Sequence, residues 1–205
     1  MYKISYFKAA NPDYVIELMR DQPFAVLMGV DQDNKPVATQ VPLLVEEREN
    51  GIFLLGHIMR NTSHHKAFEY NGNVMALFHG PHCYISADWY ENKAQASTWN
   101  YLSVQVAGVL RFLGENELKD ILNKTTTRFE KEASNASYEA LPDVYVSKHL
   151  PAIIGFEIQV VSINHTFKLS QNKDAKTFDA ILHHLDLGDE QSRAIATHMR
   201  KNRTT

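Results

Sequence analysis

The first half of the chain alternates short apolar runs with tight turns, and this spacing restricts the fold more than any other feature. Asp31-Gln32-Asp33-Asn34 and Glu49-Asn50-Gly51 are turn sequences, the second of the Asn-Gly kind that closes β-hairpins. Six or so closely spaced strands with few helices among them are typical of a small closed or partly closed β-barrel. The expected strands cover residues 24–30, 37–45, 52–57, 74–79, 98–113 and 153–167, with residues 83–86 also extended.

Helices are expected at both ends of this region and in the second half of the chain. Asn11-Pro12-Asp13 combines a capping side chain with proline at the first helical position, and Pro23 ends the helix that follows. Thr62 or Ser63 is the expected cap of another short helix. The apolar spacing predicts further helices over residues 115–132, 174–185 and 190–200. We therefore expect one barrel domain with helices outside it and at its C-terminus.

Composition places the chain among ordinary globular proteins. Its 205 residues are 44% hydrophobic and 22% charged, so a chain of this length buries a sizeable core without disulfides or a structural metal. Cys83 is the single cysteine, and the N-terminus lacks the apolar core of a signal peptide, so a cytoplasmic protein is expected. The formal net charge of −3 gives no general attraction for nucleic acid.

A first candidate site lies between Gly56 and His64. The segment combines a flexible glycine, Arg60, two hydroxyls and an expected helix start. A phosphate suits this combination, because a fixed cation, hydroxyl donors and free helix N–H groups can converge on it. The same residues are also compatible with an ordinary polar loop that carries a solvated arginine.

A second candidate region is rich in histidine and aromatic residues. His79-Gly80-Pro81-His82-Cys83-Tyr84 is followed by Trp89-Tyr90 and then by Thr98-Trp99-Asn100-Tyr101. These residues suggest a wall for a flat ligand, with Trp99 stacked on a ring and Asn100 bonded to its edge. A packed rim of core aromatics is an equally good interpretation.

Motifs for other chemistries are missing from the sequence. The ten histidines include no His-Glu-x-x-His, and Cys83 has no second cysteine, so no metal site is predicted. Phosphate-binding glycine loops and a Gly-x-Ser-x-Gly nucleophile elbow are also absent. Classical dehydrogenase and acyl-transfer functions are therefore not expected.

Taken in order, these segments resemble the PaiB family of FMN-binding negative transcriptional regulators. The resemblance reaches from Met1 to about Asn172, with the last helices more loosely similar. It rests on Met1-Tyr2, Pro23-Phe24-Ala25, Ala38-Thr39, Pro42-Leu43-Leu44, Gly56-His57, Phe78-His79-Gly80-Pro81-His82-Cys83-Tyr84-Ile85-Ser86, Trp89-Tyr90, Thr98-Trp99-Asn100-Tyr101, Gly155-Phe156-Glu157-Ile158 and Phe167-Lys168-Leu169-Ser170-Gln171-Asn172.

The resemblance implies a mainly β fold, a six-stranded FMN-binding split barrel with peripheral helices. Such barrels are related to flavin reductases and pyridoxamine-phosphate oxidases, and they are usually homodimers with a flavin site at the subunit interface. Residues 1–172 are then expected to form the FMN-binding domain. Residues 173–205 are expected to form a helical extension on or beside the barrel.

The resemblance also implies four groups of FMN-binding residues: along the flavin ring, at the phosphate, on the opposite wall or neighbouring subunit, and closing the site. In that order they are Thr39, Gln40 and Pro42; Arg60 with His57 and Thr62 or Ser63; Trp99 and Asn100; and Lys168, Ser170 and Gln171. After the arginine the family commonly has Ala-Asn-Pro, whereas this chain has Asn61-Thr62-Ser63. The role of the family's asparagine is thus displaced or lost, and Asn61 joins the candidates.

Several functions remain open at this stage. The resemblance implies a regulator that senses or uses flavin. DNA binding would depend on a cluster of basic residues near the C-terminus, Arg193, Arg200, Lys201 and Arg203. The main alternative is an FMN-dependent oxidoreductase of the flavin-reductase or pyridoxamine-phosphate-oxidase kind, with His79, His82 or Tyr84 near the substrate. A haem-binding barrel that uses His183 or His184 and a cofactor-free dimeric module are further alternatives.

Overall fold

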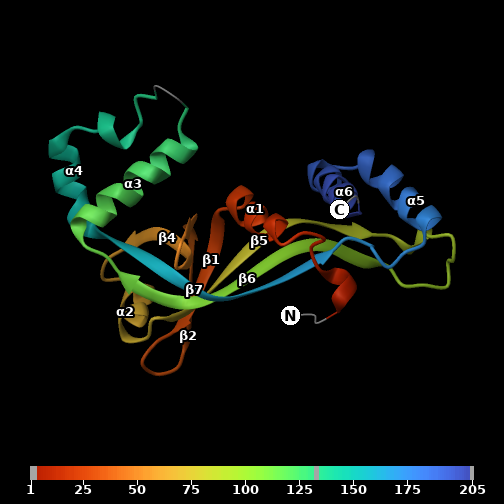
Figure 1. Cartoon of the computed structure of the whole chain (residues 1–205), viewed down its shortest axis with the longest axis horizontal. Coiled ribbons are helices and arrows are strands. Elements are labelled where there is room, and N and C mark those ends of the chain that lie inside the picture. Colours follow the sequence, from red (N-terminus) through yellow and green to blue (C-terminus); the bar gives the residue numbers. More distant parts are fainter. Residues whose placement is uncertain (1–3, 132–133, 204–205) are drawn as a thin grey trace. The chain divides into compact units, whose positions relative to one another are not determined.

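The computed structural model of the chain describes residues 4–131 and 134–203, and within them it contains seven strands and six α-helices (Figure 1). The strands are β1 (Phe24–Val30), β2 (Pro36–Pro42), β3 (Leu44–Arg48), β4 (Gly51–Met59), β5 (Asn73–Ile85), β6 (Thr98–Phe112) and β7 (Ile153–Lys168). The helices are α1 (Asp13–Asp21), α2 (Ser63–Tyr70), α3 (Glu115–Phe129), α4 (Asp143–His149), α5 (Ala175–Asp186) and α6 (Glu190–Arg203).

The chain forms two compact units. We call one the helical unit (Met1–Gln22, Phe78–Gln105 and Asn164–Thr205) and the other the barrel unit (Pro23–Leu77 and Val106–Ile163). The strands β5, β6 and β7 run through both. The expected division at residue 172 stays a prediction, because these units are groups of residues in contact rather than consecutive stretches of sequence.

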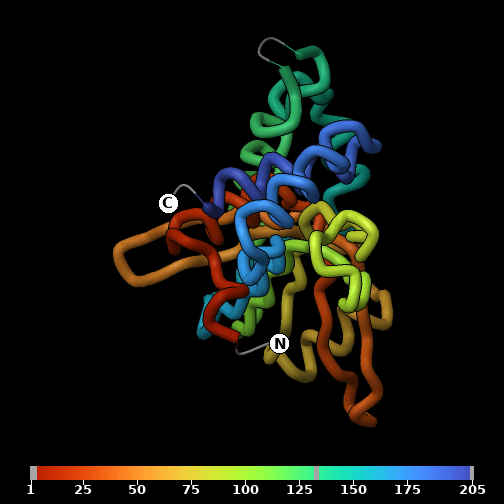
Figure 2. The backbone as a smooth tube through the Cα atoms, turned by 90° about the vertical axis from the view of Figure 1, so that its right-hand side faces the viewer, coloured from red at the N-terminus to blue at the C-terminus, as the bar shows by residue number. Residues whose placement is uncertain are grey.

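The strands of the barrel unit belong to a sheet that closes on itself. The strand order is β2-β1-β5-β6-β7-β4-β3, and the pairs β1–β2, β1–β5, β3–β4 and β4–β7 are antiparallel. β2 and β3 stand at opposite ends of this order, yet only Leu43 separates them along the chain. The two edges therefore meet at Leu43, and a Cβ added to Gly56 of β4 would lie 3.2 Å from the Pro42 carbonyl oxygen. Figure 2 shows the β1–β2 and β3–β4 hairpins as two separate loops.

The expected number of six strands is wrong, because the predicted strand over residues 37–45 is two strands. Pro42 has no N–H to continue a ladder, and the Leu43 N–H instead donates to the Pro23 carbonyl at 2.8 Å. The chain leaves its pairing with β1 at that point and begins β3, which pairs with β4. A mainly β fold with peripheral helices is confirmed, with seven strands.

The predicted break between residues 79 and 83 is also wrong, because β5 is continuous. Gly80-Pro81 was expected to end a strand, but both residues are buried within β5. A Cβ at residue 80 would lie 3.0 Å from the Leu102 Cβ and 3.2 Å from Leu18 Cδ1. Glycine thus permits the close approach of β6 and α1 rather than a turn.

The predicted helices form close to their expected bounds. α1 begins at Asp13, whose N–H donates to the Asn11 side chain at 2.9 Å. Thr62 is the N-cap of α2, and Asp174 is the N-cap of α5. In the helical unit α1, α5 and α6 lie on one side of the strand segments (Figure 1), with fully buried side chains such as Leu18, Ile181 and Ile195.

Candidate functional site

The turn from β4 into α2 carries the predicted phosphate-binding residues of the barrel unit. The backbone N–H of Arg60 donates to the Ala152 carbonyl at 2.9 Å, and its Nε donates to the Ile153 carbonyl at 3.0 Å. These bonds hold the Arg60 backbone and the Nε atom in place, while the side chain stays exposed to solvent. Asn61 follows with φ of 63°, the left-handed conformation that asparagine tolerates best after glycine. The turn thereby presents an arginine beside the first residues of a helix.

The first turn of α2 is organised by Thr62 and His65. The Thr62 hydroxyl donates to the Met59 carbonyl at 3.0 Å and accepts from the His65 N–H at 3.3 Å. His65 is only 5% exposed, and its Nδ1 accepts the Asn61 N–H at 3.4 Å. Among the described residues that buried Nε2 has no hydrogen-bond partner. The His65 ring packs against Phe112 with centroids 4.9 Å apart, so this nitrogen lies in the interior rather than at the surface of the turn.

Arg60 and Ser63 line two different cavities near this turn. Arg60 lines a cavity of about 270 Å³ with Gly114, Glu115 and Leu150, among others. Ser63 lines another, of about 250 Å³, with Asp31 and Lys66. Of the two, the Arg60 cavity includes one carboxylate, and the Ser63 cavity pairs one carboxylate with one ammonium group. The two hydroxyl candidates therefore differ: Thr62 caps the helix, whereas the Ser63 side chain stays exposed beside Lys66.

The ring-binding candidates of the barrel unit lie on β2 and β4. Thr39 and Pro42 are half-buried and Gln40 is exposed on β2. The close approach of Gly56 to the Pro42 carbonyl brings the end of β2 next to β4, where His57 follows. Burial lowers the pKa of His57, so at neutral pH it offers a hydrogen bond rather than a positive charge.

Two of the candidates in the helical unit bond to each other in its interior. Asn100 is 0% exposed, and its amide nitrogen donates to Ser170 Oγ at 2.9 Å while its oxygen accepts from that hydroxyl at 3.2 Å. Ser170 is itself buried, with a φ of 61°. This bond ties β6 to the end of β7. The amide is thus already engaged, and contact with a flavin edge would require it to rearrange.

Lys168 and Gln171 are half-buried beside that pair. The Lys168 ammonium donates to the Thr98 hydroxyl, and burial followed by repulsion from Lys173 lowers its pKa. The Gln171 side chain accepts the Leu169 N–H at 2.8 Å and so holds the bend after β7. Of these two side chains, only that of Lys168 carries a charge for a ligand to contact.

The helical unit also presents four outward-facing rings, which we call the aromatic row: His79, His82 and Tyr84 on β5, and Trp99 on β6. The ring centroids lie 4.8 Å apart for His79 and His82, 6.0 Å for His82 and Trp99, and 5.9 Å for Tyr84 and Trp99. Tyr84 and Trp99 are each 52% exposed. Half-exposed rings of this size forfeit on the order of 1–2 kcal/mol of burial each. The expected FMN-binding residues included only Trp99 of this row, whereas His79, His82 and Tyr84 were expected in the second candidate region, as a wall for a flat ligand or near a substrate. The row extends along β5 because that strand is continuous.

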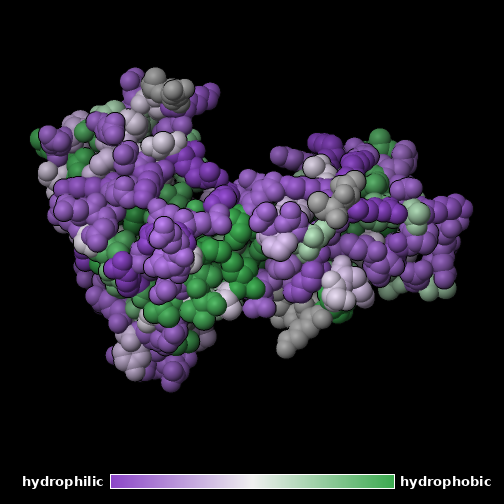
Figure 3. Space-filling view, in the orientation of Figure 1, coloured by the Kyte–Doolittle hydropathy of each residue, from purple (hydrophilic) through white to green (hydrophobic). Residues whose placement is uncertain are grey.

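The barrel unit presents a contrasting surface, which we call the aliphatic face: Met28, Val30, Met75, Val109 and Val161. Val161 is 71% and Val109 47% exposed, and a groove of about 370 Å³ runs among these side chains over Gly108. Figure 3 shows hydrophobic residues gathered over the strands of this unit. An exposed aliphatic surface of this kind is typical of a contact between proteins.

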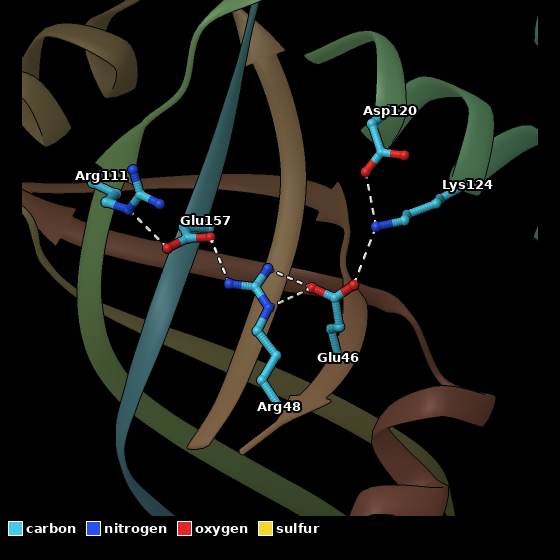
Figure 4. Close-up of polar contacts among 6 residues, drawn as sticks. All are labelled: Glu46, Arg48, Arg111, Asp120, Lys124 and Glu157. Atoms are coloured by element: carbon cyan, nitrogen blue, oxygen red, sulfur yellow. Dashed lines mark hydrogen bonds and ion pairs between the residues drawn. The ribbon is translucent and has the colours of Figure 1, made fainter. Parts of the chain in front are cut away.

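A charged cluster links β3, β6, β7 and α3 in the barrel unit (Figure 4). Glu157, whose side chain is 7% exposed, accepts from Arg111 Nε at 2.7 Å and from Arg48 at 3.1 Å. Glu46 lies between Arg48 and Lys124, and Lys124 also pairs with Asp120 at 2.8 Å. Three cations face three carboxylates, so the cluster holds the elements together and leaves no net charge for a ligand.

Other candidate groups are engaged within the helical unit. Arg200 pairs with Asp186, Lys201 with Glu17 and Arg203 with Asp179. His184 stacks on Trp89 with centroids 4.9 Å apart. Burial raises the pKa of the Cys83 thiol to about 12, which makes it unreactive at neutral pH. Within residues 4–131 and 134–203, no three His, Cys, Asp or Glu side chains gather as metal ligands, and no helix is long and apolar enough to cross a membrane.

Two solved structures share the fold of this chain. The flavocytochrome Anf3 from Azotobacter vinelandii is 13% identical, with a TM-score of 0.62 over 87% of this chain and 78% of that protein. An FAD- and haem-binding protein from Mycobacterium smegmatis is 15% identical, with a TM-score of 0.57 over 84% of this chain and 78% of that protein. At these identities the similarity defines the fold alone.

Sequence similarity then identifies the family. Residues 1–162 match the family described as "Putative FMN-binding domain", and the chain belongs to it. The chain is also 30% identical to the "Protease synthase and sporulation protein PAI 2" of Bacillus subtilis (strain 168), over 90% of this chain and 89% of that protein. The resemblance to the PaiB family is thereby confirmed, and the family match supports FMN as the cofactor. Lys168, Ser170 and Gln171 lie beyond the matched residues.

Proposed function

We propose that this protein binds FMN as a homodimer and is a PaiB-type regulator that senses or uses the flavin. The family match supplies the cofactor. The observation that carries the proposal is the turn at Arg60, where an exposed guanidinium and a left-handed Asn61 adjoin the N-terminus of α2. When bound, FMN would supply redox chemistry through its isoalloxazine ring.

In the proposed site the phosphate lies against the Arg60 turn. Arg60 contributes charge and the N-terminal N–H groups of α2 contribute fixed dipoles, whereas Ser63 lines a separate cavity and is not assigned to the phosphate. Thr62 contributes by capping α2. His57, uncharged at neutral pH, and the β2 residues Thr39, Gln40 and Pro42 are assigned to the ring. Trp99 and Lys168 belong to the helical unit and stay candidates for the flavin ring by resemblance alone.

The aliphatic face is the proposed contact with a second copy of the chain. Its exposed valines and methionines include no charged group, and such surfaces are characteristic of the cores of homodimer interfaces. A two-fold contact through one self-complementary surface would bury it on both copies.

The single cysteine, buried and unreactive, accords with a cytoplasmic protein.

The regulatory role rests on the resemblance to the PaiB family, and the Bacillus relative is named for protease synthesis and sporulation. DNA binding through the basic C-terminal residues gains no support, because Arg200, Lys201 and Arg203 are paired with carboxylates of the same unit. We therefore assign the regulatory signal to the flavin and the dimer rather than to a DNA-reading helix.

An FMN-dependent oxidoreductase is the second candidate function, and the aromatic row favours it. A flavin enzyme needs a surface that receives a second substrate, and this row combines exposed rings with imidazoles. Burial and the neighbouring His82 lower the pKa of His79, so it is uncharged at neutral pH and able to accept a proton.

The direct test is Arg60→Ala. We expect FMN affinity to fall more than tenfold, about 1.4 kcal/mol, because the phosphate loses its cation. Equilibrium titration followed by flavin fluorescence measures this. Arg193→Ala is the matched control, because that arginine bonds to the Gly188 carbonyl in the other unit. An unchanged affinity in Arg60→Ala would remove Arg60 from the site.

A further inference from the structure

We propose that residues 4–12 form a strap that neutral His165 holds closed and that protonation of its imidazole releases. The strap contains the 3-10 turn Ser5–Phe7 and leads directly into α1. Together with His165 it belongs to the helical unit. The inference concerns contacts within that unit and does not depend on FMN.

Two side chains from the C-terminal part of the sequence hold the strap. The Ala9 N–H donates to His165 Nε2 at 3.0 Å, and the Lys8 ammonium group donates to the His165 carbonyl at 2.9 Å. The Ala10 N–H donates to Asn202 Oδ1 at 2.9 Å, and the Asn202 amide donates in turn to the Lys8 carbonyl at 3.5 Å. Because His165 lies on β7 and Asn202 on α6, side chains rather than a backbone ladder join the strap to these two elements.

The bond from Ala9 exists only while His165 is neutral. An imidazole nitrogen that accepts a hydrogen bond carries no proton, and protonation turns it into a donor. A protonated Nε2 would face the Ala9 N–H as one donor against another. The closed strap would therefore lose this bond in acid.

The charges around His165 oppose its protonation while the strap is closed. Lys8 is the charged group that faces it from the strap, and burial followed by repulsion from this ammonium group lowers the pKa of His165. The groups nearby on α6 and β7 are the uncharged Asn202 and Phe167, whose ring centroid lies 5.4 Å from that of His165. No carboxylate of residues 4–131 and 134–203 pairs with the imidazole. Since release hydrates His165 and separates it from Lys8, the open strap binds a proton more tightly, and acid favours release.

The strap covers the end of β7. Phe7 is only 6% exposed and lies beside the Lys168 ammonium group, whose Nζ is 5.9 Å from the centroid of the Phe7 ring. Burial is also the first cause that lowers the pKa of Lys168. Release would carry Phe7 away and hydrate Lys168, so the strap couples pH to the exposure of this ammonium group.

Hydrogen exchange of the Ala9 and Ala10 amides tests the strap, measured by NMR on the full chain and corrected for the intrinsic exchange rate at each pH. From about pH 7.5 to about pH 5 we expect the protection of both amides to fall about tenfold, because histidine titrates in this range. The amide of Leu54, fully buried on β4 in the barrel unit, should keep its protection and is the internal control.

Three variants assign the effect to His165. His165→Gln keeps an acceptor that does not titrate, so the protection of Ala9 and Ala10 should become independent of pH. Asn202→Ala should lower the protection of Ala10 at every pH and leave its dependence on pH in place. His79→Gln is the matched control, a histidine of the same unit whose pKa is also lowered, and it should respond to pH as the wild type does.

Three results would overturn the inference. The first is wild-type protection of Ala9 and Ala10 that does not change with pH, and the second is a pH response that persists in His165→Gln. The third is loss of Leu54 protection at the same pH, which would mean that the whole chain unfolds and that no separate strap opens.

Discussion

Two exposed surfaces of this protein differ in the kind of side chain that the strands present. The aliphatic face of the barrel unit displays Met75, Val109 and Val161 around a groove. The aromatic row of the helical unit displays rings that carry polar atoms. Both surfaces leave large apolar groups in water, which folding alone does not favour.

The difference indicates what each surface is for. Aliphatic side chains without hydrogen-bonding groups are stabilised best by another surface of the same kind. The free energy of burying them depends on the apolar area removed from water and not on orientation. Rings with polar edges bind best to a partner whose shape and hydrogen-bonding groups match theirs. We therefore assign a second copy of the chain to the first surface and a ring ligand to the second.

The largest effect should come from placing charge on the aliphatic face. Val109→Lys combined with Val161→Lys would bury four ammonium groups in a two-fold dimer, and we expect about a thousandfold weaker association, about 4 kcal/mol. Sedimentation equilibrium measures it. Val144→Lys is the control, because Val144 is 82% exposed on α4 and lies outside the face. A wild-type chain that is monomeric at micromolar concentration would refute this assignment.

The next prediction compares the stability cost of replacing one glycine beneath each surface, Gly108 under the aliphatic face and Gly80 under the aromatic row. A Cβ at Gly108 would lie 2.5 Å from the Gln159 carbonyl oxygen, a backbone atom, whereas a Cβ at Gly80 would meet side-chain atoms at 3.0 Å and beyond. We expect Gly108→Ala to lower the free energy of unfolding by about 3 kcal/mol and Gly80→Ala by about 1 kcal/mol. Urea unfolding measures both. The reverse order would contradict the packing described for the two units.

A smaller effect should appear on acidification in both units, with three of the histidines behind it in the helical unit and two, His57 and His64, in the barrel unit. Burial is the first cause that lowers the pKa of His79, His165 and His198 in the helical unit. The unfolded chain then binds more protons, so their contribution to stability is present above pH about 6.5 and is lost as the pH falls through the folded pKa values. Hydrogen exchange at several pH values would follow each unit. His198→Gln should reduce the slope in the helical unit, and an identical slope would contradict this.

Much of the barrel could be predicted from sequence because its strands are apolar runs bounded by turns. The predictions failed where tertiary contacts outweighed local signals. Pro42 divides one apolar run between two partners, which local sequence does not reveal. Gly80-Pro81 has turn residues, yet close packing on Leu102 keeps it within a strand.

The candidate site was less predictable than the fold. Arg60 and Thr62 could be found because a cation, hydroxyls and a helix start adjoin in sequence. Asn100 was expected at a ligand edge, and its bond to Ser170, 70 residues away, could not be read locally. The residues of the aromatic row were grouped from sequence, but their common exposed face could not be predicted. It depends on a shift of the alternation within β5, where Gly80 and Pro81 are both buried.

One measurement tests the central claim most directly: sedimentation equilibrium of the purified protein with added FMN, detected both by protein absorbance and by flavin absorbance. We predict that flavin sediments with a species of twice the chain mass and that the double Lys variant of the aliphatic face abolishes this species. Flavin that remains free in solution, or that sediments with a single chain, would contradict the account.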